Sequence, residues 1–168
     1  MRESSDRLWA PWRSGYITNT RKGRSMCIFC RARRSRNDRA MQVLARGRRV
    51  FCLLNRYPYN VGHAMVAVSR HVGELSALTA QERSELMQMA ERMVTAMRRA
   101  LRPHGFNLGI NLGRIAGAGI PGHLHVHIVP RWSGDTNFMP VVGGTKVLSQ
   151  SLDELYAKLR PLISRKRG

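Results

Sequence analysis

Three histidines at alternating positions are the residues of this chain whose types and spacing favour chemistry. They are His123, His125 and His127, separated by Leu124 and Val126 and followed by further apolar residues. Strict alternation over this stretch predicts a half-buried β-strand whose three imidazoles share one face, about 13 Å from first to last. A row of imidazoles suits either metal binding or chemistry on a phosphate.

A glycine-rich loop leads directly into this strand. It contains Gly113, Gly117, Gly119 and Gly122. Glycines allow backbone N–H groups to approach anionic oxygens closely. A glycine loop alone is a weak sign of phosphate binding, and a single strand histidine is usually a hydrogen-bonded, half-exposed residue. The combination of the loop and the histidines predicts a site that handles a phosphate.

The segments around the histidines resemble a known family. The run from His123 to Trp132 resembles the signature of the histidine triad superfamily of nucleotidyl hydrolases and transferases. Further segments look like the branch that contains diadenosine tetraphosphate phosphorylase-like proteins: Leu8 to Arg13, Leu54 to His63, Asn111 to Gly113, Ala116 to Gly119 and Gly134 to Met139. The likeness covers residues 7 to 160, nearly the whole chain.

A covalent mechanism through His125 follows from position and from the resemblance together. A histidine attacks phosphorus only as a neutral imidazole with one nitrogen unprotonated, and the central residue of the three has a neighbour on each side. The resemblance implies that His125 takes up the α-phosphoryl group of a nucleotide, as a phosphoramidate to AMP. His127 would bind or protonate the departing oxygen, and His123 completes the catalytic set.

The resemblance also implies which residues bind the substrate. Asn55 would hold the ribose hydroxyls, Leu53 would face the base, and Asn111 would contact the phosphate. From its position, Asn55 is also typical of a turn residue that caps its own backbone. The backbone around Gly117 and Gly119 would stabilise developing charge, and Trp132 completes the expected substrate-binding set.

The acceptor of the nucleotidyl group stays open. Water gives hydrolysis and inorganic phosphate gives phosphorolysis, and the branch resemblance favours phosphorolysis of diadenosine tetraphosphate (Ap4A) to ATP and ADP. Many relatives carry a serine, threonine or glutamine before the triad that contacts the phosphate. The stretch from Gly119 to Gly122 has no such side chain. A second possibility is hydrolysis of adenosine phosphoramidates, and a third is a nucleic-acid-binding or scaffold protein that keeps the fold.

Two cysteines spaced as CxxC, Cys27 and Cys30, allow metal binding, redox chemistry or neither. Two thiolates are half of a tetrahedral zinc site. Some triad relatives use a Cys₂His₂ set, and by this resemblance His71 and His123 are the expected partners of the cysteines around a structural zinc. Iron at the same place is a lesser option, and a reduced pair without metal is the other alternative.

The elements that must position these residues give an α+β fold. We expect an antiparallel sheet of about five strands, one long helix and a C-terminal helix, in a single domain over residues 1–168 with flexible ends at 1–6 and 163–168. Two capping boxes open the helices, Thr79 with Glu82 and Ser151 with Glu154. The arginine-rich residues 31–40 read as a surface loop. The expected strands are 41–45, 50–54, 63–68, 106–112 and 123–129, and the expected helices are 80–101 and 152–159.

The charge is strongly basic, with 29 Lys and Arg against 10 Asp and Glu and a net charge of +19. Such an excess favours anionic partners, which a dinucleoside polyphosphate or a nucleic acid would satisfy. No apolar run is long enough to span a membrane, and the polar N-terminus shows no secretory signal. With three cysteines, these features favour a cytoplasmic protein. The resemblance implies a homodimer formed through the long helix and an edge strand.

Overall fold

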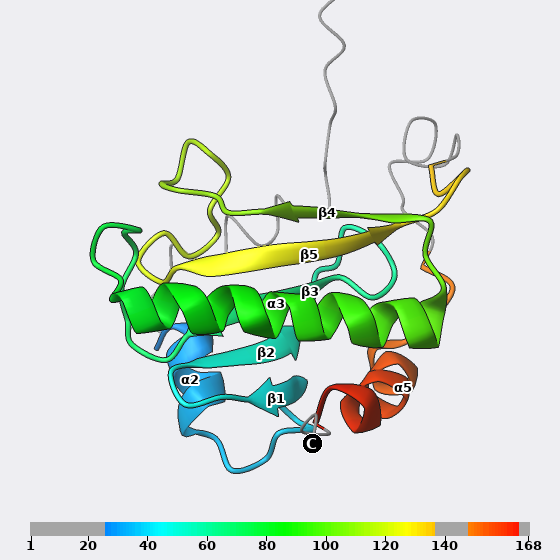
Figure 1. Ribbon diagram of the computed structural model, residues 1–168, viewed down its shortest axis with the longest axis horizontal. Coiled ribbons are helices and arrows are strands. Elements are labelled where there is room, and N and C mark those ends of the chain that lie inside the picture. The colour runs from blue at the N-terminus through cyan, green and yellow to red at the C-terminus, as the bar shows by residue number, and fades with distance from the viewer. Residues whose placement is uncertain (1–25, 137–147, 165–168) are drawn as a thin grey trace, which may run out of the picture. The chain divides into compact units, whose positions relative to one another are not determined.

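One antiparallel sheet is the frame of the described chain, as the strand pattern predicts (Figure 1). The computed structural model describes residues 26–136 and 148–164. All of these except Thr136 belong to one structural unit. The aromatic segment from Trp9 to Trp12 and the family-like residues 137–139 lie outside the described residues. The single-domain assignment therefore stays a prediction.

The sheet has five strands in the order β1-β2-β3-β5-β4, and every neighbouring pair is antiparallel. The predicted α+β architecture is confirmed. The triad strand begins two residues later than expected and ends two residues later, because His123 precedes it in a turn where its N–H donates to the carbonyl of Ile120. The strands are β1 Val43–Arg46, β2 Val50–Leu54, β3 Ala64–Val68, β4 Gly105–Gly109 and β5 His125–Arg131.

Two helices cover one face of this sheet. The helix α3, Ala80–Leu101, crosses β2, β3 and β5, and α5, Leu152–Ser164, packs beside β1 and α3 (Figure 1). Both predicted capping boxes form. The helix α5 runs past the predicted end at residue 159 because Leu155, Leu159 and Ile163 continue one buried stripe at i, i+4 spacing. Ile163, expected in a flexible tail, is buried in this core.

The prediction of a loop from residue 31 is wrong for its first residues, which belong to the short helix α2, Ile28–Arg34. Phe29 and Ala32 bury one side of this two-turn helix against the sheet. The guanidinium of Arg46 donates to the carbonyls of Ala32, Arg33 and Ser35 at 2.8, 3.0 and 3.1 Å. A helix this short has too little apolar periodicity to stand out from its arginines.

The face of the sheet opposite α3 carries the histidines. Leu124, Val126 and Ile128 point into the core beneath α3. By alternation His125 and His127 point to the other side. That side is lined by a second apolar cluster: Phe29, Ala32, Val43, Phe51, Leu53, Met65 and Ala67. The apolar side chains of the triad strand therefore pack in the core beneath α3, and His125 and His127 share the opposite face of the sheet.

Among the described residues, no helix combines the length and the apolar character needed to cross a membrane. The finding is in line with the absence of a long apolar run in the sequence.

Candidate functional site

His125 lies at the start of β5 with its ring fixed by a local hydrogen bond. Its Nδ1 lies 2.7 Å from the carbonyl oxygen of His123. A carbonyl only accepts, so Nδ1 carries the proton and Nε2 carries the lone pair. The residue is 5% exposed, and burial lowers the pKa of its imidazole below the ordinary histidine value. A neutral ring with a defined unprotonated nitrogen is what a nucleophile on phosphorus requires.

His127 has the opposite protonation pattern, set by a chain of hydrogen bonds that begins at a backbone amide. The N–H of Tyr59 donates to Nδ1 of His63 at 3.0 Å, so that nitrogen must accept. The proton of His63 is therefore on Nε2, which donates to Nδ1 of His127 at 2.9 Å. It follows that the proton of His127 is on Nε2. The rings of His125 and His127 lie 4.8 Å apart between centroids.

His63 is a functional residue that the sequence interpretation missed, although it was visible in a family-like segment. Position 63 shares the alternation of Met65 and Ala67 along β3, and these two pair with His127 and His125. Strand periodicity could therefore have placed His63 on the triad face. Tyr59 stacks on His63 with 4.6 Å between ring centroids. No feature of the sequence indicates that contact.

The residues expected around the nucleoside lie beside the hydrogen-bonded chain of Tyr59, His63 and His127. Leu53 is in the cluster on the triad face and pairs with Met65, which pairs with His127. The side chain of Asn55 accepts from the N–H of Tyr57 at 2.9 Å, and its Nδ2 lies 3.3 Å from Nδ1 of His63. Asn55 thus forms the turn that its position suggested and also contacts the histidine chain.

The expected phosphate-side residues are only partly brought together. The side-chain Nδ2 of Asn111 lies 3.5 Å from the position that a Cβ at residue 117 would take. Gly117 has a φ of +85°, a backbone conformation that favours glycine. Gly119 is exposed in the same loop. Trp132 follows the end of β5, about 16 Å along the strand from His127. Its backbone N–H donates to the carboxylate of Asp135. Among the described residues, Trp132 makes no hydrogen bond and no ring contact with the triad.

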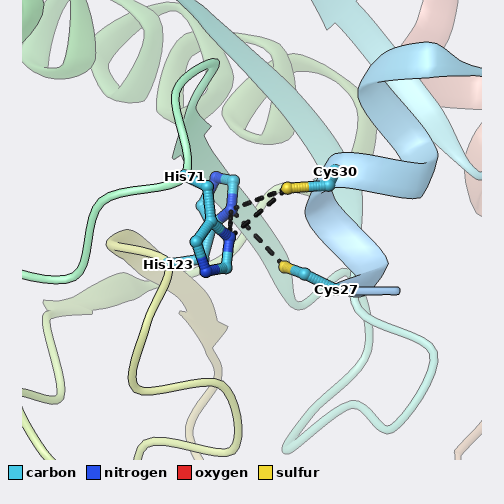
Figure 2. Close-up of side chains that lie close together, drawn as sticks. All are labelled: Cys27, Cys30, His71 and His123. Atoms are coloured by element: carbon cyan, nitrogen blue, oxygen red, sulfur yellow. Dashed lines mark hydrogen bonds between the residues drawn. The ribbon is translucent and has the colours of Figure 1, made fainter. Parts of the chain in front are cut away.

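The predicted metal ligands converge from three separate segments (Figure 2). Cys27 is the N-cap of α2 and Cys30 lies in its first turn, His71 follows β3, and His123 precedes β5. Their ligand atoms all lie within 4.8 Å of one another. The third cysteine, Cys52, is in the core under α3, where burial raises its pKa to about 12. It is not part of this cluster.

The spacing of the four ligand atoms fits a tetrahedral ion. Zinc–ligand distances of about 2.05 Å to nitrogen and about 2.3 Å to sulfur imply edges of about 3.3 Å between nitrogens and about 3.5 Å between sulfur and nitrogen. The two Nδ1 atoms of His71 and His123 are 3.3 Å apart. The sulfur–nitrogen distances are 3.4 Å from Cys27 to His123, 3.4 Å from Cys30 to His71 and 3.7 Å from Cys30 to His123.

The protonation of His123 also suits a ligand. Its Nε2 lies 2.7 Å from the carbonyl oxygen of Val68, so Nε2 donates and Nδ1 presents its lone pair to the cysteines. Burial lowers the pKa of His123 to about 4, which keeps the ring neutral. Burial raises the pKa of the Cys27 thiol, and a bound cation would oppose that shift. The donor set, spacing and tautomer all fit a metal.

Comparison with known proteins assigns the family. Residues 36–134, more than half of the chain, match the model of the HIT domain. The chain is 41% identical over 157 residues to a protein of Mycobacterium tuberculosis named AP-4-A phosphorylase, covering 90% of this chain and 80% of that protein. The chain belongs to the HIT, or histidine triad, family.

Solved structures show the same fold. A histidine triad family protein from Mycobacterium smegmatis, described as zinc-bound, superposes with a TM-score of 0.66 at 22% identity, covering 82% of this chain and 92% of that one. A hypothetical histidine triad nucleotide-binding protein from Sulfolobus tokodaii gives 0.62 at 26% identity, covering 82% and 89%. In the sequence comparison, a bis(5'-nucleosyl)-tetraphosphatase of Schizosaccharomyces pombe is 32% identical over 94 residues, which are 56% of this chain and 51% of that protein.

Proposed function

We propose that this protein is a nucleotidyltransferase that cleaves Ap4A by phosphorolysis, releasing ATP and ADP. The observation that carries the proposal is the opposite protonation of two neighbouring rings: His125 presents a lone pair at Nε2, and His127 presents a proton there. One ring is prepared to attack and the other to donate. The similarity to AP-4-A phosphorylase supports the choice of substrate and acceptor.

In the first step, Nε2 of His125 attacks the α-phosphorus of the bound dinucleotide. A P–N bond forms and the P–O bond to the rest of the molecule breaks, so ATP departs and AMP stays on His125. The Nε2–H of His127 donates a hydrogen bond to the departing oxygen, which leaves as the weakly basic terminal phosphate of ATP and needs no proton. Asn111 and the backbone near Gly117, which lie next to one another, are proposed to stabilise the developing charge.

In the second step, inorganic phosphate attacks the adenylated histidine. A P–O bond forms, the P–N bond breaks, and ADP leaves with His125 restored. Nε2 of His125 regains its lone pair and His127 keeps its Nε2 proton, which closes the cycle. Leu53 and Asn55 are proposed to hold base and ribose through both steps, because they flank the His63–His127 pair on the same face.

We also propose that Cys27, Cys30, His71 and His123 hold a structural zinc. All four protein ligands are present in the cluster, and closed tetrahedral sites of this kind are structural rather than catalytic. A bound zinc would supply cross-linking between α2, the segment that follows β3 and the turn that precedes β5. It would leave the phosphoryl chemistry to the histidines. Metal analysis of the purified protein tests this assignment.

The decisive experiment is incubation with Ap4A, with and without inorganic phosphate, followed by separation of products. The proposal predicts ADP and ATP that appear only with phosphate. AMP and ATP formed without phosphate would make the protein a hydrolase. Turnover of an adenosine phosphoramidate alone would assign the leaving group differently. The variant His125→Asn must lose at least about 10³-fold in kcat, and no AMP adduct should then be trapped on the protein.

A homodimer is proposed with the function. The strand β4 is an edge of the sheet and exposes Leu108 to 45%, which leaves a strand available for pairing. Light scattering at micromolar concentration should give twice the chain mass. A monomer would refute this part of the proposal while leaving the chemistry in place.

The net charge of +19 favours a second candidate, a nucleic-acid-binding protein that keeps the HIT fold. It differs from the first in a measurable way. Salt-sensitive RNA binding that survives His125→Asn, in a protein that turns over no nucleotide, would favour this candidate. Pure binding gives no reason for the paired tautomers of His125 and His127, so the enzyme remains the better-supported function.

A further inference from the structure

One aromatic side chain, Phe29, lies between the metal-ligand cluster and the central histidine. It stands between Cys27 and Cys30 in the sequence and is 1% exposed. Its ring centroid is 4.6 Å from that of His125 and 5.0 Å from that of His123. The side chain of Phe29 has no hydrogen-bonding group, so it can affect the histidines only through ring packing. It touches the ring that the proposed reaction requires to be fixed.

The two ends of α2 are held in different ways. At the C-terminal end, Arg46 binds three carbonyls and also Asp38, with Nε 2.8 Å from its carboxylate. At the N-terminal end, Cys27 occupies the cap position with no side-chain capping bond, and the first turn contains no acidic residue. A helix of 7 residues has little stability of its own.

The polar side-chain contacts at the N-terminal end of α2 are those among the metal-ligand atoms. Cys27 approaches His123 and Cys30 approaches both histidines of the set (Figure 2). Without a metal these are weak thiol–imidazole contacts. With a metal, they would become bonds that fix the first turn of α2 and, within it, the backbone that carries Phe29.

We propose that Phe29 is a positioning residue for His125, and that metal binding by the cluster holds Phe29 against that ring. The ring of His125 is thus held in two ways: by its hydrogen bond to the carbonyl of His123 and by its contact with the ring of Phe29. This inference rests on the proposed function for its kinetic consequences. Its structural content, a metal-dependent contact that fixes one imidazole, does not depend on the substrate.

The chain offers a matched control in Phe51. It is equally buried at 1% and belongs to the same apolar cluster. Its strand neighbour is Ala67, and it makes no ring contact with the histidines in the described structure. Phe29→Leu and Phe51→Leu therefore remove similar aromatic volume from the same cluster. Only the first removes the ring that touches His125.

Kinetics of the full chain loaded with one equivalent of zinc give the first test. Phe29→Leu should lower kcat for Ap4A phosphorolysis by about tenfold or more, since small misplacement of a reacting group is costly, and change KM by less than about threefold. Phe51→Leu should keep kcat within about threefold while losing similar thermal stability. Equal kcat losses in the two variants, or a rise in KM alone for Phe29→Leu, would overturn the proposal.

Nitrogen-15 spectra of the histidine rings give the second test, which needs no turnover. The zinc-loaded parent should show His125 as a single tautomer with its proton on Nδ1. Removal of zinc, or Phe29→Leu with zinc bound, should add the other tautomer, and restoring zinc should reverse the first change. A His125 signal unaffected by both changes would overturn the proposal. If the parent fails to cleave Ap4A, the proposed function fails and these spectra still decide the inference.

Discussion

The two ends of the triad segment are held by different kinds of support. His127 takes its tautomer from a chain that starts at the backbone N–H of Tyr59 and passes through His63. His123 takes its tautomer from the carbonyl of Val68, but its other nitrogen faces two cysteines and His71. A backbone amide cannot dissociate, whereas a metal can. The support of His127 is therefore built into the fold, whereas the support of His123 depends on whether a metal is bound.

The largest expected effect comes from breaking the His127 end. His63→Phe fills the same buried space without a donor, so nothing holds the proton of His127 on Nε2. We expect kcat for Ap4A to fall by about 10²-fold or more, with zinc content unchanged. A 2,4-dinitrophenyl ester of AMP should suffer much less, because its leaving oxygen is far less basic than that of ATP and gains less from the hydrogen bond of His127. Equal losses on the two substrates would contradict the assigned role.

Removing the metal should chiefly change stability. The double variant Cys27→Ser with Cys30→Ser should lose zinc, and its unfolding free energy should fall by about 4 kcal/mol relative to a parent with free zinc at a thousand times its Kd. Chelation of the parent should have the same effect on its thermal midpoint. The kcat loss should be smaller than for His63→Phe, because the His127 end does not depend on the metal.

The third cysteine provides the control for that measurement. Cys52→Ala opens a small cavity in the core under α3 and should lower the thermal midpoint by the same amount with and without chelator. If chelation leaves the midpoint of the parent unchanged, the cluster holds no structural metal. The contrast between the two ends of the triad then disappears.

Much of this site could be predicted from the sequence because it depends on short periodicities. Alternation along one strand places His125 and His127 on one face and Val126 in the core, and the capping box at Thr79 marks the start of α3. These signals are local, and they lie within a segment that also identifies the family. The four expected metal ligands do come together, because the resemblance supplied a pairing that spacing alone could not.

The parts that the sequence did not predict depend on contacts between distant segments. Phe29 lies next to His125 only because α2 folds back onto the sheet, nearly a hundred residues away along the chain. The arginines of α2 concealed its apolar periodicity in the sequence. Arg46, whose hydrogen bonds hold the C-terminal end of α2, belongs to the strand β1. The expectation that Trp132 contacts the substrate rests on resemblance alone and stays a prediction, because Trp132 lies just beyond the end of β5.

The permanent fastening of α2 can be weakened without touching a metal ligand. Arg46→Lys keeps the charge but loses the planar fork that reaches three carbonyls, and we expect it to cost about 2 kcal/mol of unfolding free energy. Zinc stoichiometry should stay the same, since no ligand changes. Amide exchange in residues 28–34 should become more sensitive to chelation than in the parent. Unchanged sensitivity would mean that the two ends of α2 are not supported independently.

The smallest effect is expected far from both ends, at the start of α3. The bidentate pair with Arg70 is the main cause that lowers the pKa of Glu82 to about 2, and the N–H of Thr79 adds to it. A carboxylate whose pKa is lower in the folded state contributes stability above its unfolded pKa and loses that contribution as the pH falls toward the folded value. Because Arg70 is half-exposed, solvent weakens the pair, and Glu82→Gln should cost about 1 kcal/mol at neutral pH.

The pH dependence separates this contribution from those at the triad. The difference in unfolding free energy between the parent and Glu82→Gln should shrink as the pH falls from about 5 toward 2, measured by denaturant titration at each pH. The kcat of the variant should match the parent at neutral pH, because α3 packs on the face of the sheet opposite His125 and His127. A kcat loss as large as that of His63→Phe would mean that general destabilisation, and not the support of individual rings, governs the activity.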